Sequence, residues 1–147
     1  MGQVVDDIAG IRRILAQSRT IAVVGLSANW NRPSHFAAKY MQEKGYTVIP
    51  VNPAYAEVLG QRCYPDLAAI GRPVDIVDCF RKPADIVPIA REAVAIGAKV
   101  LWLQQGIRSA EARQIAEQGG LQYVEARCMG KLAAFYGITK ARQVAST

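Results

Sequence analysis

The chain has 147 residues, of which 51% are hydrophobic and 20% are charged, and this composition fits one ordinary folded domain and excludes a disordered chain. Eighteen lysines and arginines against twelve aspartates and glutamates give a net charge of +6 at pH 7. No uncharged apolar run approaches the roughly 20 residues that span a bilayer. The first residues also lack the basic and apolar regions of a secretory signal peptide, so we expect a basic, soluble, cytoplasmic protein without a membrane partner.

The predicted elements begin with an amphipathic helix within residues 1–18, in which Ile8, Ile11 and Leu15 form one apolar stripe. Five short runs rich in β-branched residues follow, at 21–24, 47–51, 74–79, 99–103 and 121–124. Their starts lie 22 to 27 residues apart, which is typical of strand-plus-helix units and not of hairpins. Because the runs are apolar throughout, they predict the buried strands of a parallel sheet.

Three helices are predicted between these strands. The first covers residues 34–45 and ends at a glycine. The second begins at Pro83, and Pro88 within it implies either a kink or a later start. The third is capped by Ser109 and ends near Gly119.

These units predict an α/β fold over residues 1–147, a single Rossmann-like, doubly wound domain with a five-stranded parallel sheet flanked by helices. Because crossovers are right-handed, 3-2-1-4-5 is the simplest strand order. The connection over residues 55–72 is long for a loop, so we expect a short strand or helical turn there. Residues 129–147 are expected to form a C-terminal tail that starts with a helix and then frays.

In an open parallel sheet, ligands bind beyond the carboxyl ends of the strands. The loop after the first strand offers Gly25 for close backbone approach, hydroxyls from Ser27 and Ser34, and paired donors from Arg32. The helix that follows has an N-terminus that attracts anions. These features suit a pyrophosphate, and the alternative is a long polar turn in which Ser34 only caps the helix.

The first two loops lack the marks of a dinucleotide or ATP site. The first contains neither G-x-G-x-x-G nor G-x-x-x-x-G-K-[ST]. The second, Val51-Asn52-Pro53, has no carboxylate for a ribose diol. Its amide and its proline suit an adenine ring instead, and a rigid strand-ending turn is the alternative.

The third and fourth loops add charge and amides. Arg81 and Lys82 lie beside a predicted helix start and suit a polyanion, although exposed basic pairs are also common on surfaces. Gln104 and Gln105 offer hydrogen bonds and Gly106 offers close approach, which suits a ligand that carries amides. A plain turn is the alternative for the fourth loop.

Groups for catalysis or metal binding are few. His35 is the only histidine, and we expect it to bond the loop or a phosphate rather than to act as an acid or base. Asp75 and Asp78 should face opposite sides of their strand. Cys79 is expected to be a buried strand residue, the alternative being a reactive thiolate beside Arg81.

The three cysteines are widely spaced. They are Cys63, Cys79 and Cys128, and they form no C-x-x-C motif. This spacing predicts neither a disulfide framework nor a zinc site. We therefore expect free thiols that are buried or half-buried, and neither a metal site nor a catalytic residue.

Four segments together resemble the family of small stand-alone CoA-binding proteins, over about residues 21–128. The segments are R-P-S-H at 32–35, P-V-N-P at 50–53, F-R at 80–81 and W-L-Q-x-G at 102–106. This family is related to the CoA-binding domain of the succinyl-CoA synthetase α subunit and of ADP-forming acyl-CoA synthetases. The resemblance implies a Rossmann-like fold that binds coenzyme A.

The resemblance also implies a role for each matching position. The pyrophosphate would be surrounded by Gly25, Ser27, Arg32, Pro33, Ser34 and His35, the adenosine bordered by Val51, Asn52 and Pro53, the pantetheine or a phosphate met by Phe80, Arg81 and Lys82, and the pantetheine arm by Gln104, Gln105 and Gly106. The segment from Met129 onward departs from the family pattern, in which a lysine and an acidic residue often follow the cysteine.

We therefore expect noncatalytic binding of coenzyme A or an acyl-CoA. The alternatives are an NAD(P)-linked oxidoreductase and a CoA-using transferase subunit. The basic charge permits nucleic-acid binding, but the lysines and arginines are scattered with no run longer than two, so we do not expect a nucleic-acid partner. A homodimer and a subunit of a larger complex are both compatible with the sequence.

Overall fold

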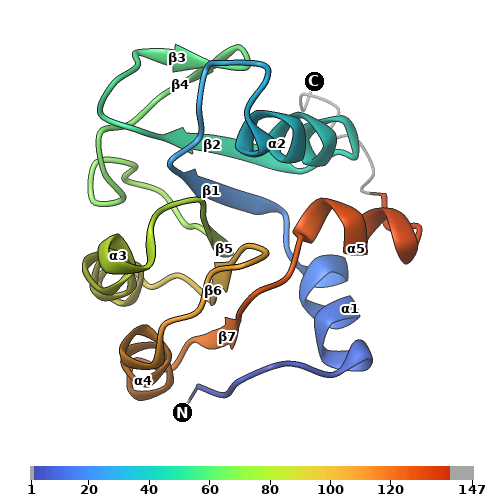
Figure 1. Cartoon of the computed structure of the whole chain (residues 1–147), viewed down its shortest axis with the longest axis vertical. Helices are drawn as coiled ribbons and strands as arrows, with labels where there is room; N and C mark the ends of the chain where they lie inside the picture. The colour runs from blue at the N-terminus through green and yellow to red at the C-terminus, as the bar shows by residue number, and fades with distance from the viewer. Residues whose placement is uncertain (1, 140–147) are drawn as a thin grey trace.

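A five-stranded parallel sheet lies at the centre of the computed structural model, which describes residues 2–139 (Figure 1). Each strand overlaps one of the five apolar runs of the sequence. The strands are β1 (Thr20–Val24), β2 (Thr47–Val51), β5 (Ile76–Cys79), β6 (Val100–Leu103) and β7 (Gln122–Val124). The α/β, Rossmann-like fold with a parallel sheet is therefore confirmed.

The helices lie close to their predicted positions. They are α1 (Ile8–Gln17), α2 (Pro33–Glu43), α3 (Pro83–Ala95), α4 (Ala110–Gln118) and α5 (Met129–Phe135). Helix α3 begins at Pro83 and continues through Pro88, so the later start was wrong. The hydroxyl of Ser109 accepts the amide of Ala112 at 3.1 Å and caps α4 as predicted. The predicted tail begins with α5, and its last residues, 140–147, lie outside the described part of the chain.

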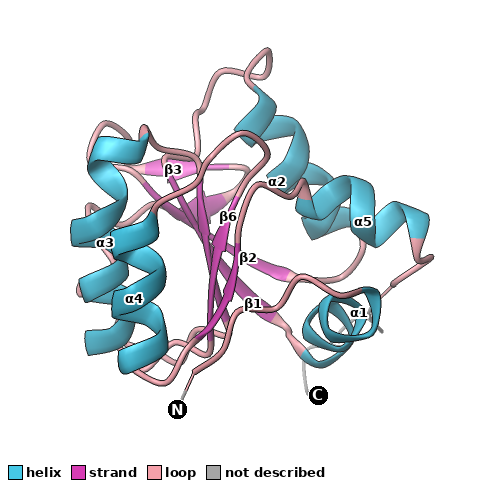
Figure 2. Ribbon diagram, turned by 60° about the horizontal axis from the view of Figure 1, so that its bottom comes forward, coloured by secondary structure: helices cyan, strands magenta, loops and turns pink. Residues whose placement is uncertain are grey.

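The helices cover both faces of the sheet, as Figure 2 shows. Helices α1, α2 and α5 pack on one face around the fully buried Leu15 and Trp102. Helices α3 and α4 pack on the other face around Ile86 and Leu101. Burial on both faces explains why the strands are continuously apolar in the sequence.

The strand order differs from the predicted one. The order is β2-β1-β5-β6-β7, so the third main strand pairs with the first instead of lying outside the second, and 3-2-1-4-5 was wrong. The outer edge of β2 is occupied at its carboxyl end by the chain around Tyr64, which forms a parallel bridge to Val51. The amide of Tyr64 donates to Pro50 O at 3.0 Å and its carbonyl accepts the amide of Asn52 at 2.8 Å. This segment follows the hairpin β3 (Glu57–Val58) and β4 (Gln61–Arg62), which confirms the short strand expected in the long connection.

Asp75 fixes β5 beside β1 at the amino ends of the two strands. Its carboxylate accepts the amides of Arg19 and Thr20 at 2.8 and 3.0 Å, and Lys99 Nζ lies 3.5 Å away. Burial acts to raise the pKa of Asp75, but the two amide bonds and the charge of Lys99 outweigh it and lower that pKa. A carboxylate at this position therefore stabilises the observed order.

The N-terminal segment covers the outer side of β7, the edge strand opposite β2. Val4 forms a parallel bridge to Tyr123, and the amide of Val5 donates to Tyr123 O at 2.8 Å. Within residues 2–139, no helix combines the length and apolar character that crossing a membrane requires.

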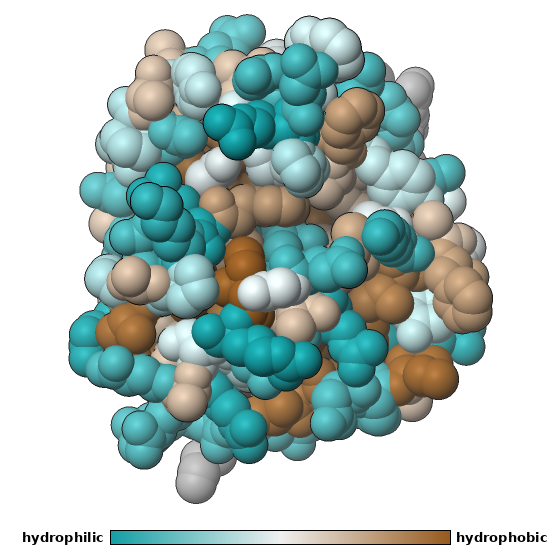
Figure 3. Space-filling view, viewed as in Figure 1, coloured by the Kyte–Doolittle hydropathy of each residue, from teal (hydrophilic) through white to brown (hydrophobic). Residues whose placement is uncertain are grey.

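Some large apolar side chains remain exposed, and Figure 3 shows hydrophobic patches among hydrophilic residues on one face of the molecule. The exposed side chains are Ile8, Trp30, Phe36 and Phe135. Ile8 belongs to the stripe predicted for the first helix, of which only Ile11 and Leu15 are buried. The buried face of α1 also includes Gly10 and Ile14, so it is displaced from the predicted stripe and not narrower than it.

Candidate functional site

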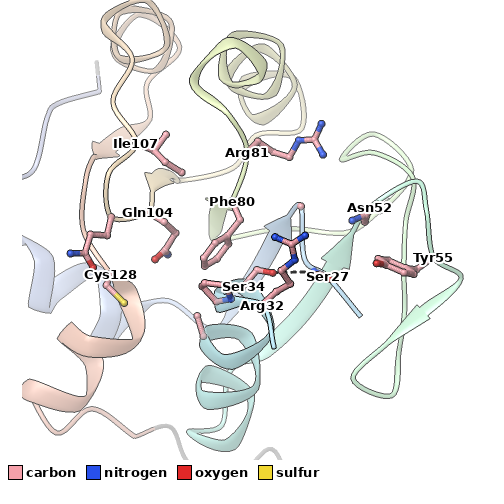
Figure 4. Close-up of a pocket in the computed structure, with 14 residues that line it drawn as sticks. Ser27, Arg32, Ser34, Asn52, Tyr55, Phe80, Arg81, Gln104, Ile107 and Cys128 are labelled. Atoms are coloured by element: carbon pink, nitrogen blue, oxygen red, sulfur yellow. Dashed lines mark hydrogen bonds between the residues drawn. The ribbon is translucent and has the colours of Figure 1, made fainter. Parts of the chain in front are cut away.

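A cavity of about 670 Å³ lies at the carboxyl edge of the sheet. The strand order arranges the loops along this edge in the sequence β2, β1, β5, β6, β7. Figure 4 accordingly shows Asn52 and Tyr55 at one end of the cavity and Gln104 and Cys128 at the other, with Phe80 between them. A ligand in this cavity would therefore extend across the strands.

Gly25 ends β1 at the point where the sheet opens into the cavity. Its amide donates to Val51 O at 2.9 Å, and the amide of Phe80 donates to Val24 O at 2.9 Å, so β1 is bonded to both neighbours. Gly25 has a φ of +88°, and a Cβ there would lie 2.5 Å from Phe80 O. Both the left-handed backbone and the close approach require glycine.

The loop between β1 and α2 is held by its own polar groups. Ser34 Oγ accepts the amide of Ser27 at 3.1 Å, and His35 Nδ1 donates to Ser27 O at 3.0 Å. Helix α2 has Arg32 as its N-cap, without a side-chain capping bond, and Pro33 as its first residue. The alternative in which Ser34 caps the helix is therefore wrong, and His35 bonds the loop as expected.

Two arginines line the middle of the cavity. Arg32 stands at the N-terminus of α2 and is exposed. Arg81 follows β5 and forms an exposed ion pair with Asp85, with 3.3 Å between Nη2 and Oδ2. Together with the positive end of the α2 dipole, these guanidinium groups make this part of the cavity favourable for an anion.

The β2 end of the cavity is neutral. Asn52 Nδ2 donates to Leu26 O at 3.1 Å, and its Oδ1 accepts the amide of Ala54 at 2.9 Å. Val51 and Pro53 line an adjoining cavity of about 250 Å³, which shares Asn52 with the larger one. An amide, and not a carboxylate, thus stands at the end of β2.

At the β6 end, Gln104 is buried and both ends of its amide are bonded. Nε2 donates to the carboxylate of Asp78, and Oε1 accepts the amide of Met129 at 3.4 Å. Burial raises the pKa of Asp78 to about 7, although the bond from Gln104 acts to lower it. Gln104 therefore joins β5, β6 and the start of α5, in addition to lining the cavity.

The cysteines are free thiols, as expected, with Cys63 and Cys79 buried and Cys128 half-buried. Burial raises the pKa of Cys79 well above its ordinary value, and the charge of Asp78 acts in the same direction. The alternative of a reactive thiolate at Cys79 is therefore wrong. Within residues 2–139, no three His, Cys, Asp or Glu side chains gather in a way that could hold a metal ion.

Ten of the fifteen candidate residues meet around the larger cavity: Gly25, Ser27, Arg32, Pro33, Ser34, Asn52, Phe80, Arg81, Gln104 and Gln105. Val51 and Pro53 lie beside the adjoining cavity. His35, Lys82 and Gly106 line neither of these two cavities.

Sequence reasoning missed four residues that line the larger cavity: Ala37, Tyr55, Ile107 and Cys128. The rule that ligands bind beyond strand ends, applied to the fifth strand as well, would have included the loop that leads to Cys128. No comparable signal marks Ala37, which lies within helix α2.

Comparison with known proteins identifies clear relatives. A family model described as the CoA binding domain matches residues 19–134. Protein YneT of Bacillus subtilis is 40% identical over 121 residues, which cover 82% of this chain and 90% of YneT. An ADP-forming acetate–CoA ligase of Archaeoglobus fulgidus is 28% identical over 125 residues, which cover 78% of this chain but 18% of the ligase. The solved structure of a Pyrococcus horikoshii protein superimposes with a TM-score of 0.86 at 38% identity, covering 88% of this chain and 92% of that one.

Proposed function

Because the chain belongs to the CoA binding domain family, we propose that its single domain binds coenzyme A or an acyl-CoA in the cavity at the carboxyl edge of the sheet, without catalysing a reaction. The observation that carries this proposal is the order of chemistry along the cavity. Neutral groups lie at the β2 end, two guanidinium groups and a helix N-terminus lie in the middle, and amides lie at the β6 end. Coenzyme A has an adenine, then phosphates, then an arm with two amides and a thiol.

Each part of the ligand then has a matching part of the cavity. The adenosine lies near Asn52 and Tyr55, and the pyrophosphate lies between Arg32 and Arg81 at the start of α2. The pantetheine arm passes Phe80 towards the β6 loop, where Gln105 lines the cavity. The thiol end comes to the side of the cavity formed by the loop after β7.

An NAD(P)-linked oxidoreductase is less well supported by the same residues. A dinucleotide site in this fold holds the ribose diol with a carboxylate at the end of the second strand. Asn52 stands there instead, and both its amide atoms are bonded to the backbone, to Leu26 O and to the amide of Ala54. His35, which could otherwise serve as a base, donates to the backbone of Ser27. The ligase relative is far longer than this chain, so its reaction is not transferred here.

Calorimetric titration of the purified full chain with CoA, dephospho-CoA, NAD and ATP tests the proposal. We expect CoA to bind most tightly and dephospho-CoA more weakly, because the 3′-phosphate adds charge that the basic site attracts. Preferential binding of NAD would support the oxidoreductase, and binding of none of the four would overturn the proposal. Chromatography of acetyl-CoA after incubation with the protein tests the noncatalytic part, for which we expect the thioester to be recovered intact.

A further inference from the structure

A second hollow lies outside the CoA cavity, between helices α2 and α5, and we name it the α2–α5 groove. It has a volume of about 650 Å³. Helix α2 contributes Phe36 and Tyr40, and helix α5 contributes Gly130 and Ala134. Two polar residues, Asn31 and Lys131, also line the groove. Exposed apolar surface of this kind marks a binding site for an apolar ligand, another protein or a membrane.

The groove is continuous with the CoA cavity. Pro33, Ala37 and Cys128 line both hollows. Of the three, Cys128 lies at the side of the cavity that receives the thiol end of the ligand in the proposed function, and Pro33 and Ala37 lie on the first turns of α2. A group attached to the sulfur of coenzyme A would therefore leave the cavity past Cys128 and enter the groove.

The two helices leave room for such a group. Gly130 is the second residue of α5 and lines the groove without a side chain. A Cβ at this position would lie 3.7 Å from Tyr40 Cδ1, so alanine fits and any longer side chain would project towards α2. Phe36 is 61% exposed, which leaves an aromatic face open at the side of the groove.

We propose that the α2–α5 groove holds the acyl chain of a medium-chain acyl-CoA, so that the preferred ligand is the thioester and not free coenzyme A. This inference rests on the proposed function, because the chain reaches the groove only if the CoA part occupies the cavity. An aliphatic chain is the occupant that fits both the apolar lining and the junction at Cys128, since it needs no polar partner.

Titration of the full chain with CoA, acetyl-CoA and octanoyl-CoA tests the inference. Each fully buried methylene raises affinity about fourfold, and a chain in an open groove is only partly buried. We therefore expect octanoyl-CoA to bind at least about tenfold more tightly than acetyl-CoA. Equal affinities for the two thioesters would overturn the inference while leaving the proposed function intact, whereas no binding of any of the three would contradict the proposed function itself.

A substitution that fills the groove locates the effect. Ala134 is exposed and lines the groove but not the CoA cavity, so Ala134→Trp should fold and should reduce the ratio of octanoyl-CoA affinity to CoA affinity towards one. Ala95→Trp is the matched control, because Ala95 is an exposed helical alanine that lines neither hollow, and it should keep the ratio of the unmodified chain. An unchanged ratio in Ala134→Trp would overturn the inference.

Sedimentation at several protein concentrations examines the other occupant of an apolar groove, a second copy of the chain. We expect octanoyl-CoA to bind without a change in oligomeric state. A dimer that Ala134→Trp dissociates, together with affinities that do not depend on chain length, would assign the groove to a second copy and overturn the inference.

Discussion

Polar groups have opposite roles at the amino edge of the sheet, where the parallel strands begin, and at its carboxyl edge, where they end. At the amino edge, Asp75 accepts the amides of Arg19 and Thr20, and the carbonyl of Arg19 accepts the amide of Thr47 at 2.8 Å. At the carboxyl edge, the side chains of Arg32 and Gln105 line a cavity. The amino edge thus holds the strands in order, whereas the carboxyl edge leaves charge and amides available for a ligand.

Two aspartates, one just before β5 and one within it, show the same contrast. Asp75, just before the strand, has a lowered pKa because donors surround it. Asp78, inside the strand, has a pKa raised to about 7 by burial. The two carboxyl groups show that the surroundings of a side chain, and not its chemistry, decide whether it stabilises the fold as an anion.

The largest effect should come from Gly25→Ala at the carboxyl edge. A left-handed backbone at a residue other than glycine costs about 1–3 kcal/mol, and the new Cβ would also lie 2.5 Å from Phe80 O. We expect a lower free energy of unfolding and loss of CoA binding in titrations. Gly106→Ala is the matched control, because Gly106 has a φ of +85° but a Cβ there would meet no atom within 4 Å, so it should lose less stability and keep CoA binding. Equal losses in both variants would contradict the role of the close approach.

Arg32→Ala should weaken CoA binding with little effect on folding. A hydrogen bond to a charged group contributes about 1.5–3 kcal/mol, so the dissociation constant should rise about 10- to 150-fold. Calorimetry on Arg72→Ala provides the control, since Arg72 is also exposed but lines neither the CoA cavity nor its neighbour. A dissociation constant that Arg32→Ala leaves unchanged would remove this guanidinium from the site.

At the amino edge, Asp75→Ala should do the reverse and lower stability while CoA affinity stays the same. Loss of the carboxylate removes its hydrogen bonds with the amides of Arg19 and Thr20, and a hydrogen bond to a charged group contributes about 1.5–3 kcal/mol. Denaturant unfolding at pH 7 measures the loss, and Asp75→Asn, which keeps an acceptor oxygen, should recover part of it. Because the folded pKa of Asp75 is lowered, its contribution is present above the unfolded pKa and is lost as the pH falls through the folded pKa.

Asp78→Asn should have its smallest effect at acidic pH, where the unmodified Asp78 is protonated, and the sign of its pH dependence is opposite to that of Asp75. Burial raises the folded pKa of Asp78 to about 7, so the folded chain binds the proton more tightly, and the contribution of this group falls as the pH rises from about 4 to about 7. Asparagine removes this dependence and keeps an acceptor for Gln104. Unfolding curves at pH 5, 7 and 9 should show the variant gaining stability over the unmodified chain between pH 5 and 7, with little further gain at pH 9. A difference that does not change with pH would mean that Asp78 keeps an ordinary pKa.

The sequence predicted the edge at which the site lies better than it predicted the order of strands along that edge. Apolar runs and their spacing located all five strands, because burial on both faces leaves a local mark in the composition. Nothing local distinguishes a third strand beside β1 from one beside β2. That choice depends on Asp75, which bonds Arg19 and Thr20 more than fifty positions earlier in the chain. It also depends on Tyr64, which occupies the outer side of β2 at its carboxyl end.

The missed site residues show the same limit. Cys128 reaches the cavity because the loop after β7 leads into α5, of which Cys128 is the N-cap. Ala37 reaches it because it lies one turn after Pro33 on the same side of α2. Gln104 was predicted as a ligand-binding amide, but the structure also gives it a bond to Asp78, 26 positions earlier. Such pairings arise from packing between distant segments, which periodicity in one stretch of sequence does not contain.

The coverage of both outer strands has a consequence for assembly. Val4 pairs with β7 on one side and Tyr64 with the carboxyl end of β2 on the other, so main-chain groups at these positions are already bonded within the chain. A strand from another molecule finds few donors and acceptors there, which protects against edge-to-edge aggregation. At these positions, association with a neighbour must therefore use side chains on helices and loops rather than a sixth strand.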